Sequence, residues 1–145
     1  MSVIVEILAS NPLTSAVYAL RNGVFVVEQG VPEDLEVDED DRGATHLAAL
    51  SDGEVIGTLR IVHHERRAKI GRVAILASAR KQGVGRELME RAAAIAFRDG
   101  ADEIVLGAQL TARGFYQRLG YVEEGAPFDD AGILHVMMRK MLGRT

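Results

Sequence analysis

The segment Arg72–Ala92, "RVAILASARKQGVGRELMERA", decides the fold more than any other part of the chain. Its first residues are apolar and predict a strand, and the residues after Gly85 repeat apolar side chains at helical spacing. Two closely spaced glycines, Gly83 and Gly85, predict a tight connection from which the helix starts at once. Free N–H groups and the positive end of the helix dipole would therefore face outward, which suits a phosphate or a pyrophosphate.

Two better-known phosphate motifs are excluded at this connection. The Walker A motif needs a glycine followed by Lys and then Ser or Thr, and neither glycine is followed in this way. The dinucleotide fingerprint needs a third glycine where the chain has Leu88. The pattern that remains is Arg80-x-x-Gly83-x-Gly85, with Lys81 and Arg86 adding positive charge around it. A plain strand-to-helix turn without a ligand is the alternative interpretation.

The rest of the chain predicts a mixture of strands and helices. β-Branched and alternating runs predict strands, and amphipathic runs predict helices. In chain order we expect a strand over 2–8, a helix over 11–29, an acidic loop to 43, strands over 45–50, 54–64 and 69–76, a helix from 84, a strand over 102–109, a short helix over 111–120, and strands over 121–128 and 132–140. The two strands around the long helix should be parallel, and the hairpin before them antiparallel. We therefore expect a single domain over residues 1–145, of the α/β (α+β) class, with helices covering a mixed, twisted sheet.

The composition limits the kinds of partner. The chain has 145 residues, 48% hydrophobic and 26% charged, as is usual for a soluble globular protein. Its net charge of -4 opposes binding to nucleic acid, and no apolar run approaches the ~20 residues that span a membrane. The absence of cysteine excludes thiolate metal sites and thiol nucleophiles, and it fits a cytoplasmic protein.

The stretch "EQGVPEDLEVDEDDRG", Glu28–Gly43, is strongly acidic. Seven of the nine residues from Glu33 to Asp41 are acidic. A calcium loop starting at Asp38 would need oxygen ligands where the chain has Arg42 and Ala49, so the EF-hand interpretation fails and we expect no metal.

Two interpretations of this acidic stretch stay open. Its carboxylates could favour a cationic substrate through their electric field, which is screened over ~8 Å at physiological salt. Alternatively, it is a solvated loop that keeps the protein soluble. In both cases Leu35 and Val37 are the candidates for anchoring it to the body of the protein.

Four segments of the chain resemble the GNAT superfamily of acyl-CoA-dependent N-acyltransferases. The first is the glycine pattern above, which is similar to the family's [RQ]-x-x-G-x-[GA] motif. The second is "AQLTARGFYQRLGYVEEG" (108–125), which resembles the family's helix with Phe-Tyr ahead of a Leu-Gly-Tyr turn. The segments "VFVVEQGVPEDLEVDEDD" (24–41) and "GILHVMMRK" (132–140) further resemble the ElaA-like branch. This likeness implies a mostly antiparallel sheet with one splayed parallel pair of strands.

The resemblance also implies an acetyl-CoA site. In the family, backbone amides at the glycine motif hold the pyrophosphate, and a strand edge binds the pantetheine arm. An amide of that strand, here Ile75, is a plausible donor to the thioester carbonyl. The residues that the resemblance assigns to the cofactor are Val73, Ala74, Ile75, Arg80, Lys81, Gln82, Gly83, Val84, Gly85, Arg86 and Phe115.

For catalysis, the resemblance implies direct attack of an amine on the thioester in a ternary complex. Tyr116 occupies the family's general-acid position and would protonate the leaving CoA thiolate, or donate a hydrogen bond to it. Packing beside Phe115 is the alternative role for Tyr116.

The base is less defined: Glu28 comes first, at the end of the first predicted helix, followed by His135 and His46. A structural hydrogen-bonding role is the alternative for each of these candidates. Arg60 could form a salt bridge with an acidic group or orient it, and the alternative is an ordinary arginine on the face of the sheet.

Other functions compete with this one. A non-catalytic acyl-CoA sensor would keep the glycine motif, although it has no need of Tyr116. A nucleotide-binding regulator would rest on the glycine turn alone. The acceptor amine and the acyl length are not predicted, and a homodimer is one option for assembly.

Overall fold

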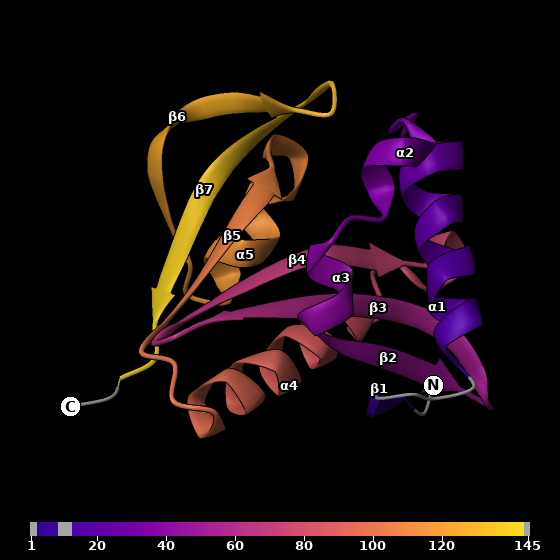
Figure 1. The fold of residues 1–145 in the computed structure, drawn as a ribbon, viewed down its shortest axis with the longest axis horizontal. Helices are drawn as coiled ribbons and strands as arrows, with labels where there is room; N and C mark the ends of the chain where they lie inside the picture. The colour runs from indigo at the N-terminus through magenta and orange to yellow at the C-terminus, as the bar shows by residue number, and fades with distance from the viewer. Residues whose placement is uncertain (1–2, 9–12, 144–145) are drawn as a thin grey trace.

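The computed structural model describes residues 3–8 and 13–143, and these form a sheet of seven strands (Figure 1). The spatial order is β1-β2-β3-β4-β5-β7-β6. The strands are β1 (Ile4–Leu8), β2 (Thr45–Ser51), β3 (Glu54–His64), β4 (Arg67–Ile75), β5 (Glu103–Gln109), β6 (Val122–Asp130) and β7 (Ile133–Met141). The predicted mixed, mostly antiparallel sheet is confirmed. The predicted starts of the first strand at residue 2 and of the first helix at residue 11 lie outside the described residues.

The neighbours β4 and β5 are parallel, and they pair over only three residues of each strand. These are Arg67–Lys69 on β4 and Glu103–Val105 on β5. The other neighbouring strands in the described part of the chain are antiparallel. Beyond Lys69 and Val105 the two strands diverge, as Figure 1 shows. The splayed parallel pair implied by the resemblance is therefore confirmed, and it opens the sheet at its middle.

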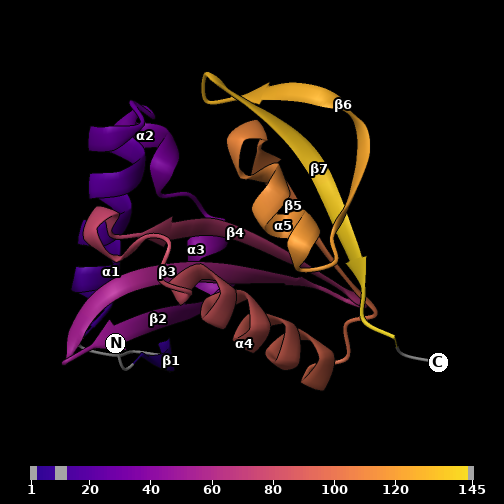
Figure 2. The same cartoon turned by 180° about the vertical axis from the view of Figure 1, so that it is seen from behind.

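Helices cover both faces of the sheet (Figures 1 and 2). One face carries α1 (Thr14–Arg21), the π-helix η1 (Asn22–Glu28), α2 (Glu33–Glu36) and α3 (Asp40–Gly43). The other carries α4 (Val84–Arg98) and α5 (Arg113–Arg118), each preceded by a short 3-10 turn, η2 (Ala77–Ala79) and η3 (Leu110–Ala112). Within the described residues, no helix is long and apolar enough to cross a membrane.

The long helix α4 packs closely against the sheet. Its buried residues are the predicted apolar positions Val84, Leu88, Met89, Ala92, Ile95 and Ala96. A Cβ at Gly57 on β3 would lie 3.0 Å from Val84 and 3.1 Å from Leu88. A side chain at Gly57 would therefore be in very tight contact with the helix. Its absence lets α4 approach β3 closely.

The region from Asn22 to Gly43 departs from the sequence-based expectation. The first helix turns into a π-helix at Asn22, and the acidic segment is not simply a loop because it contains α2 and α3. The predicted anchors Leu35 and Val37 are wrong, since they are 52% and 53% exposed. Ala16, one of the apolar residues at helical spacing in the first helix, is also exposed. Charged side chains anchor the segment instead, as described below.

Candidate active site

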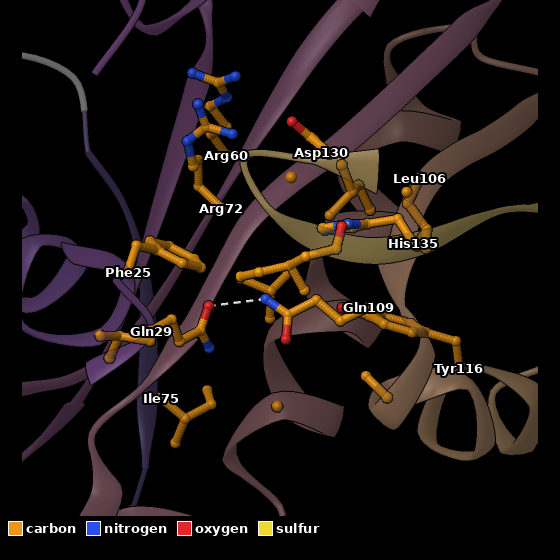
Figure 3. A pocket seen from close by; sticks show the side chains of 18 of the residues that line it. Phe25, Gln29, Arg60, Arg72, Ile75, Leu106, Gln109, Tyr116, Asp130 and His135 are labelled. Carbon is orange, nitrogen blue, oxygen red and sulfur yellow. Dashed lines mark hydrogen bonds between the residues drawn. The ribbon is translucent and has the colours of Figure 1, made fainter. Parts of the chain in front are cut away.

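A cleft of about 1250 Å³ lies where β4 and β5 diverge (Figure 3). One wall comes from η1 and β4, including Phe25 and Ile75, and the opposite wall comes from β5, β7 and α5, including Tyr116. The start of α4 and the turn between β6 and β7 also line it. The divergence of the parallel strands thus creates the cleft, and it brings together segments from almost the whole chain.

The start of α4 opens into this cleft with its backbone amides free. Gly83 is the N-cap, in the left-handed conformation with φ 84°, and no side chain caps the helix. The first helical bond runs from the amide of Glu87 to the carbonyl of Gly83, at 3.1 Å. The N–H groups before Glu87 therefore have no helical partner and can bind an anion. This arrangement fits a pyrophosphate, as expected from the resemblance.

The two glycines of the motif have different physical roles. Gly83 needs its positive φ, whereas a Cβ there would meet no atom within 4 Å. At Gly85 there is little room for a side chain, because a Cβ would lie 3.1 Å from Cζ of Phe115. Gly85 thus lets the α5 aromatic ring rest against the start of α4.

Arg80 forms an ion pair with Glu28 within the protein. Its guanidinium donates two hydrogen bonds of 2.6 Å to the carboxylate of Glu28, and Nε donates one of 3.0 Å to the carbonyl of Ile75. The hydrogen bonds from Arg80 lower the pKa of Glu28. Arg86 pairs with Glu90. Of the cations in the glycine motif, Lys81 is the one without an acidic partner in the described part of the chain. Its backbone has a positive φ of 62°.

The outer half of β4 has no strand paired with it on the side of β5, although Arg80 bonds to the carbonyl of Ile75. Ala74 and Ile75 pair with β3 on one side, and β5 no longer pairs with β4 on the other. The side chains of Val73 and Ile75 line the cleft, while Ala74 is buried. The segment is therefore placed where an extended ligand arm could add to the strand edge.

Tyr116 is buried in α5 and reaches the cleft from the face that α4 and α5 cover. Figure 3 shows its side chain pointing to the interior of the cleft. Its ring packs edge-on against Phe115 and Tyr121, with centroid distances of 4.9 and 6.0 Å. Burial raises the pKa of Tyr116 to about 12. The phenol therefore keeps its proton at neutral pH and can donate a hydrogen bond.

His135 lines the same cleft from β7 (Figure 3). Its Nδ1 lies 2.7 Å from the carbonyl of Ile133. A carbonyl only accepts hydrogen bonds, so in the neutral ring Nδ1 carries the proton and Nε2 keeps its lone pair. The ring also stacks on Phe128, with a centroid distance of 5.9 Å and an angle of 26°. The ring is thus held in one tautomer and one orientation.

The other base candidates lie elsewhere. His46 bonds to the carbonyl of Asp41 at 2.9 Å and is absent from the cleft wall. Glu28 is likewise absent from that wall and is held by Arg80. Of the three candidates, the structure places only His135 within the cleft.

A hydrogen bond crosses the cleft between Gln109 at the end of β5 and Gln29 at the end of η1. Nε2 of Gln109 donates to Oε1 of Gln29 at 2.8 Å, as the dashed line in Figure 3 shows. The two residues are 80 positions apart in the chain. No sequence pattern indicated either glutamine, because the bond depends on where the π-helix ends.

The acidic segment is tied to the protein by arginines. Arg21, which is buried in α1, forms ion pairs of 2.7 Å with Glu36 and with Asp41. Arg60 pairs with Asp38 at 2.6 Å and with Asp41 at 3.0 Å, so the predicted link between Arg60 and an acidic group is confirmed.

These pairs hold three of the seven acidic side chains of the segment. Arg72 adds a contact of 3.3 Å to Asp38, so three carboxylates face three guanidinium groups. The described residues contain no group of three or more metal-ligating side chains that could hold a metal ion. The three paired carboxylates therefore have a structural role. Only those without an ion pair among the described residues, including Asp34 and Asp40 at the cleft, remain to act on a ligand through their field.

Comparison with known proteins decides the family. The model of the acetyltransferase (GNAT) domain matches residues 15–142. The chain belongs to the GNAT family. Among similar proteins, the uncharacterized protein YyaT of Bacillus subtilis is 37% identical over 131 residues, covering 87% of each chain. ElaA of Escherichia coli is 29% identical over 130 residues, covering 86% of this chain and 85% of ElaA.

Solved structures agree with this assignment. An acyl-CoA N-acyltransferase from Pseudomonas aeruginosa has a TM-score of 0.85 and 36% identity, over 96% of this chain and 99% of that one. The predicted GNAT membership and the likeness to ElaA are therefore confirmed. So is the predicted acetyl-CoA-dependent N-acetyltransferase activity, with acetyl-CoA as the acyl donor.

Proposed function

We propose that this GNAT protein transfers an acetyl group from acetyl-CoA to a primary amine by direct attack, with both substrates bound in the cleft. The observation that carries the proposal is that the start of α4, Tyr116 and His135 all line one cleft. The free α4 amides and Tyr116 lie on one face of the splayed sheet, and Nε2 of His135 reaches the same cleft from β7. The cleft thus has a donor end and an acceptor end.

At the donor end, the proposal assigns the CoA pyrophosphate to the amides from Gln82 to Arg86. Gly83 supports this, because it exposes the start of α4 without a capping side chain. Lys81 supplies the charge, since Arg80 is occupied by Glu28. The pantetheine arm would lie along Val73–Ile75, with the amide of Ile75 as the donor to the thioester carbonyl.

At the acceptor end, we assign the base to His135 in preference to Glu28. An amine with a pKa of ~10.4 is neutral at pH 7 in about one molecule in 2,500, which costs roughly 4.6 kcal/mol. A base must therefore take a proton, directly or through water. His135 lines the cleft and keeps the lone pair of Nε2, whereas the lowered pKa of Glu28 makes that carboxylate a weaker base.

Tyr116 completes the proposed site as the partner of the leaving thiolate. With a pKa of about 12, full proton transfer to a thiolate of ordinary pKa ~8.5 would be uphill by roughly 5 kcal/mol. A hydrogen bond from the phenol to the sulfur is therefore the better role. CoA would then leave as a stabilised thiolate that takes its proton from solvent.

The test is release of free CoA, followed with a thiol reagent, across a panel of primary amines. Amine-dependent release is expected. Tight binding of acetyl-CoA without release on any amine would support a sensor instead, and ATP displacing CoA would support a nucleotide-binding regulator. The cytoplasmic location and the homodimer stay predictions.

A further inference from the structure

The acceptor end of the cleft has an apolar floor around His135. The virtual Cβ of Gly107 on β5 lies 3.6 Å from the ring of Phe128, 3.9 Å from the sulfur of Met137 and 4.0 Å from the ring of His135. These side chains therefore share one face of the β5-β7-β6 half of the sheet. Leu106, Phe128 and Met137 all line the cleft.

The amide and guanidinium groups of this region are already bonded within the protein. Gln29 and Gln109 bond to each other across the cleft. The guanidinium group of Arg60 is paired with Asp38 and Asp41, and that of Arg72 bonds to the carbonyl of Glu36. A sugar-like acceptor that used these groups would have to break their bonds, which costs free energy.

The rim of the same end carries acidic groups. Asp34, Asp40 and Asp130 line the cleft, and none has an ion-pair partner among the residues that the structure describes. In Figure 3, Asp130 lies at the mouth, near His135. This rim attracts an ammonium group over a short range, since salt screens it beyond ~8 Å.

From this combination we infer that the acceptor is a primary amine carried on an apolar body, aliphatic or aromatic, and that Phe128 determines this preference. The inference rests on the proposed function, which supplies the amine and the reaction. The apolar body lies against Phe128 and Met137, and the amine faces Nε2 of His135. Phe128 is 36% exposed, so part of its side chain is accessible for contact with a ligand.

The experiment measures binding of two matched amines to the protein saturated with CoA. Hexylamine and 2-(2-aminoethoxy)ethanol have the same length and one amine, but differ in polarity. We expect hexylamine to bind at least about 10-fold tighter, as for several methylenes entering an apolar pocket. Phe128→Ala should bring the ratio close to one, and Phe128→Leu should keep most of it.

Leu134→Ala is the control, because Leu134 is exposed on the neighbouring strand and does not line the cleft. It should leave the ratio unchanged, and all variants should keep the CoA affinity and the melting temperature of the parent. Equal affinity for the two amines, or an unchanged ratio in Phe128→Ala, overturns the inference. Replacing CoA with acetyl-CoA tests the proposed function separately, since a bound amine that is not acetylated contradicts that proposal alone.

Discussion

The guanidinium of Arg80 and the carboxylate of Glu28 form two hydrogen bonds of 2.6 Å across 52 positions of the chain. The pair joins the end of the π-helix to the loop ahead of α4, so it connects the acceptor wall of the cleft to the expected CoA loop. Glu28 is thereby a structural partner of that loop, and its ionised form is favoured because Arg80 lowers its pKa.

Replacing Glu28 with Gln should change CoA binding more than the chemical step. The variant keeps the shape but loses the charge that orients Arg80, so we expect a severalfold change in the KM for acetyl-CoA and less than a threefold change in kcat. Steady-state kinetics with a saturating amine measures both. A loss of 100-fold or more in kcat would instead identify Glu28 as the base.

Replacing Arg21 with Met should destabilise the protein by about 3–5 kcal/mol, because Glu36 and Asp41 would stay buried without their partner. Urea unfolding at pH 7 measures this. The control is Arg66→Met, whose partner Asp102 lies in an exposed pair, and the expected loss is about 0–1 kcal/mol. An equal loss in both variants would contradict the structural role of Arg21.

The same ion pair predicts how stability depends on pH. Burial alone would raise the pKa of Asp41, but the hydrogen bonds from Arg21 and from the amide of Asp38 outweigh it and hold the pKa below its ordinary value of 3.8. A depressed folded pKa gives stability that is present above pH 3.8 and is lost as the pH falls through the folded value. Parent protein should therefore lose more stability than Arg21→Met between pH 4 and pH 2.

Replacing Gly83 with Asp should weaken CoA binding by at least about 10-fold, because it places a carboxylate beside the expected pyrophosphate. Gly83→Asn is the matched control: it has the same shape and tolerates the positive φ, but carries no charge. Calorimetry with CoA measures both variants. If Asp and Asn bind CoA equally well, the start of α4 does not hold the pyrophosphate.

Replacing Tyr116 with Phe should lower kcat more than it changes the affinity for CoA, by about 10-fold or more if the phenol bonds to the leaving sulfur. Tyr121→Phe is the control, since Tyr121 is equally buried beside it but does not line the cleft. Equal turnover in parent and Tyr116→Phe would make Tyr116 a packing residue.

Much of the fold could be predicted from local pattern. The apolar spacing of α4 predicted its buried face, because that helix packs on the sheet along its whole length. The glycine pattern at Gly83 and Gly85 predicted the turn and the free helix start. The length over which β4 and β5 pair was not predictable, because it depends on how the two halves of the sheet twist apart.

The arrangement of the acceptor side was much less predictable. Arg21 occupies a helical position between the buried Val17 and Val24, and a charge on an apolar face was the one available signal of a buried ion pair. The sequence does not show which arginines pair with the acidic segment, so the segment was interpreted from its charge alone. Leu35 and Val37 were predicted to anchor the segment, whereas in the structure Glu36 and Asp41 anchor it through Arg21.

The central claim is that His135 takes a proton from an amine that attacks acetyl-CoA in the cleft. The most direct measurement is kcat for CoA release in His135→Ala, beside His64→Ala as a control on an exposed histidine outside the cleft wall. The account predicts a loss of about 100-fold or more for His135→Ala, partly restored by added imidazole, with CoA affinity unchanged and His64→Ala like the parent. Equal kcat in His135→Ala and the parent, at the same amine concentration, would contradict it.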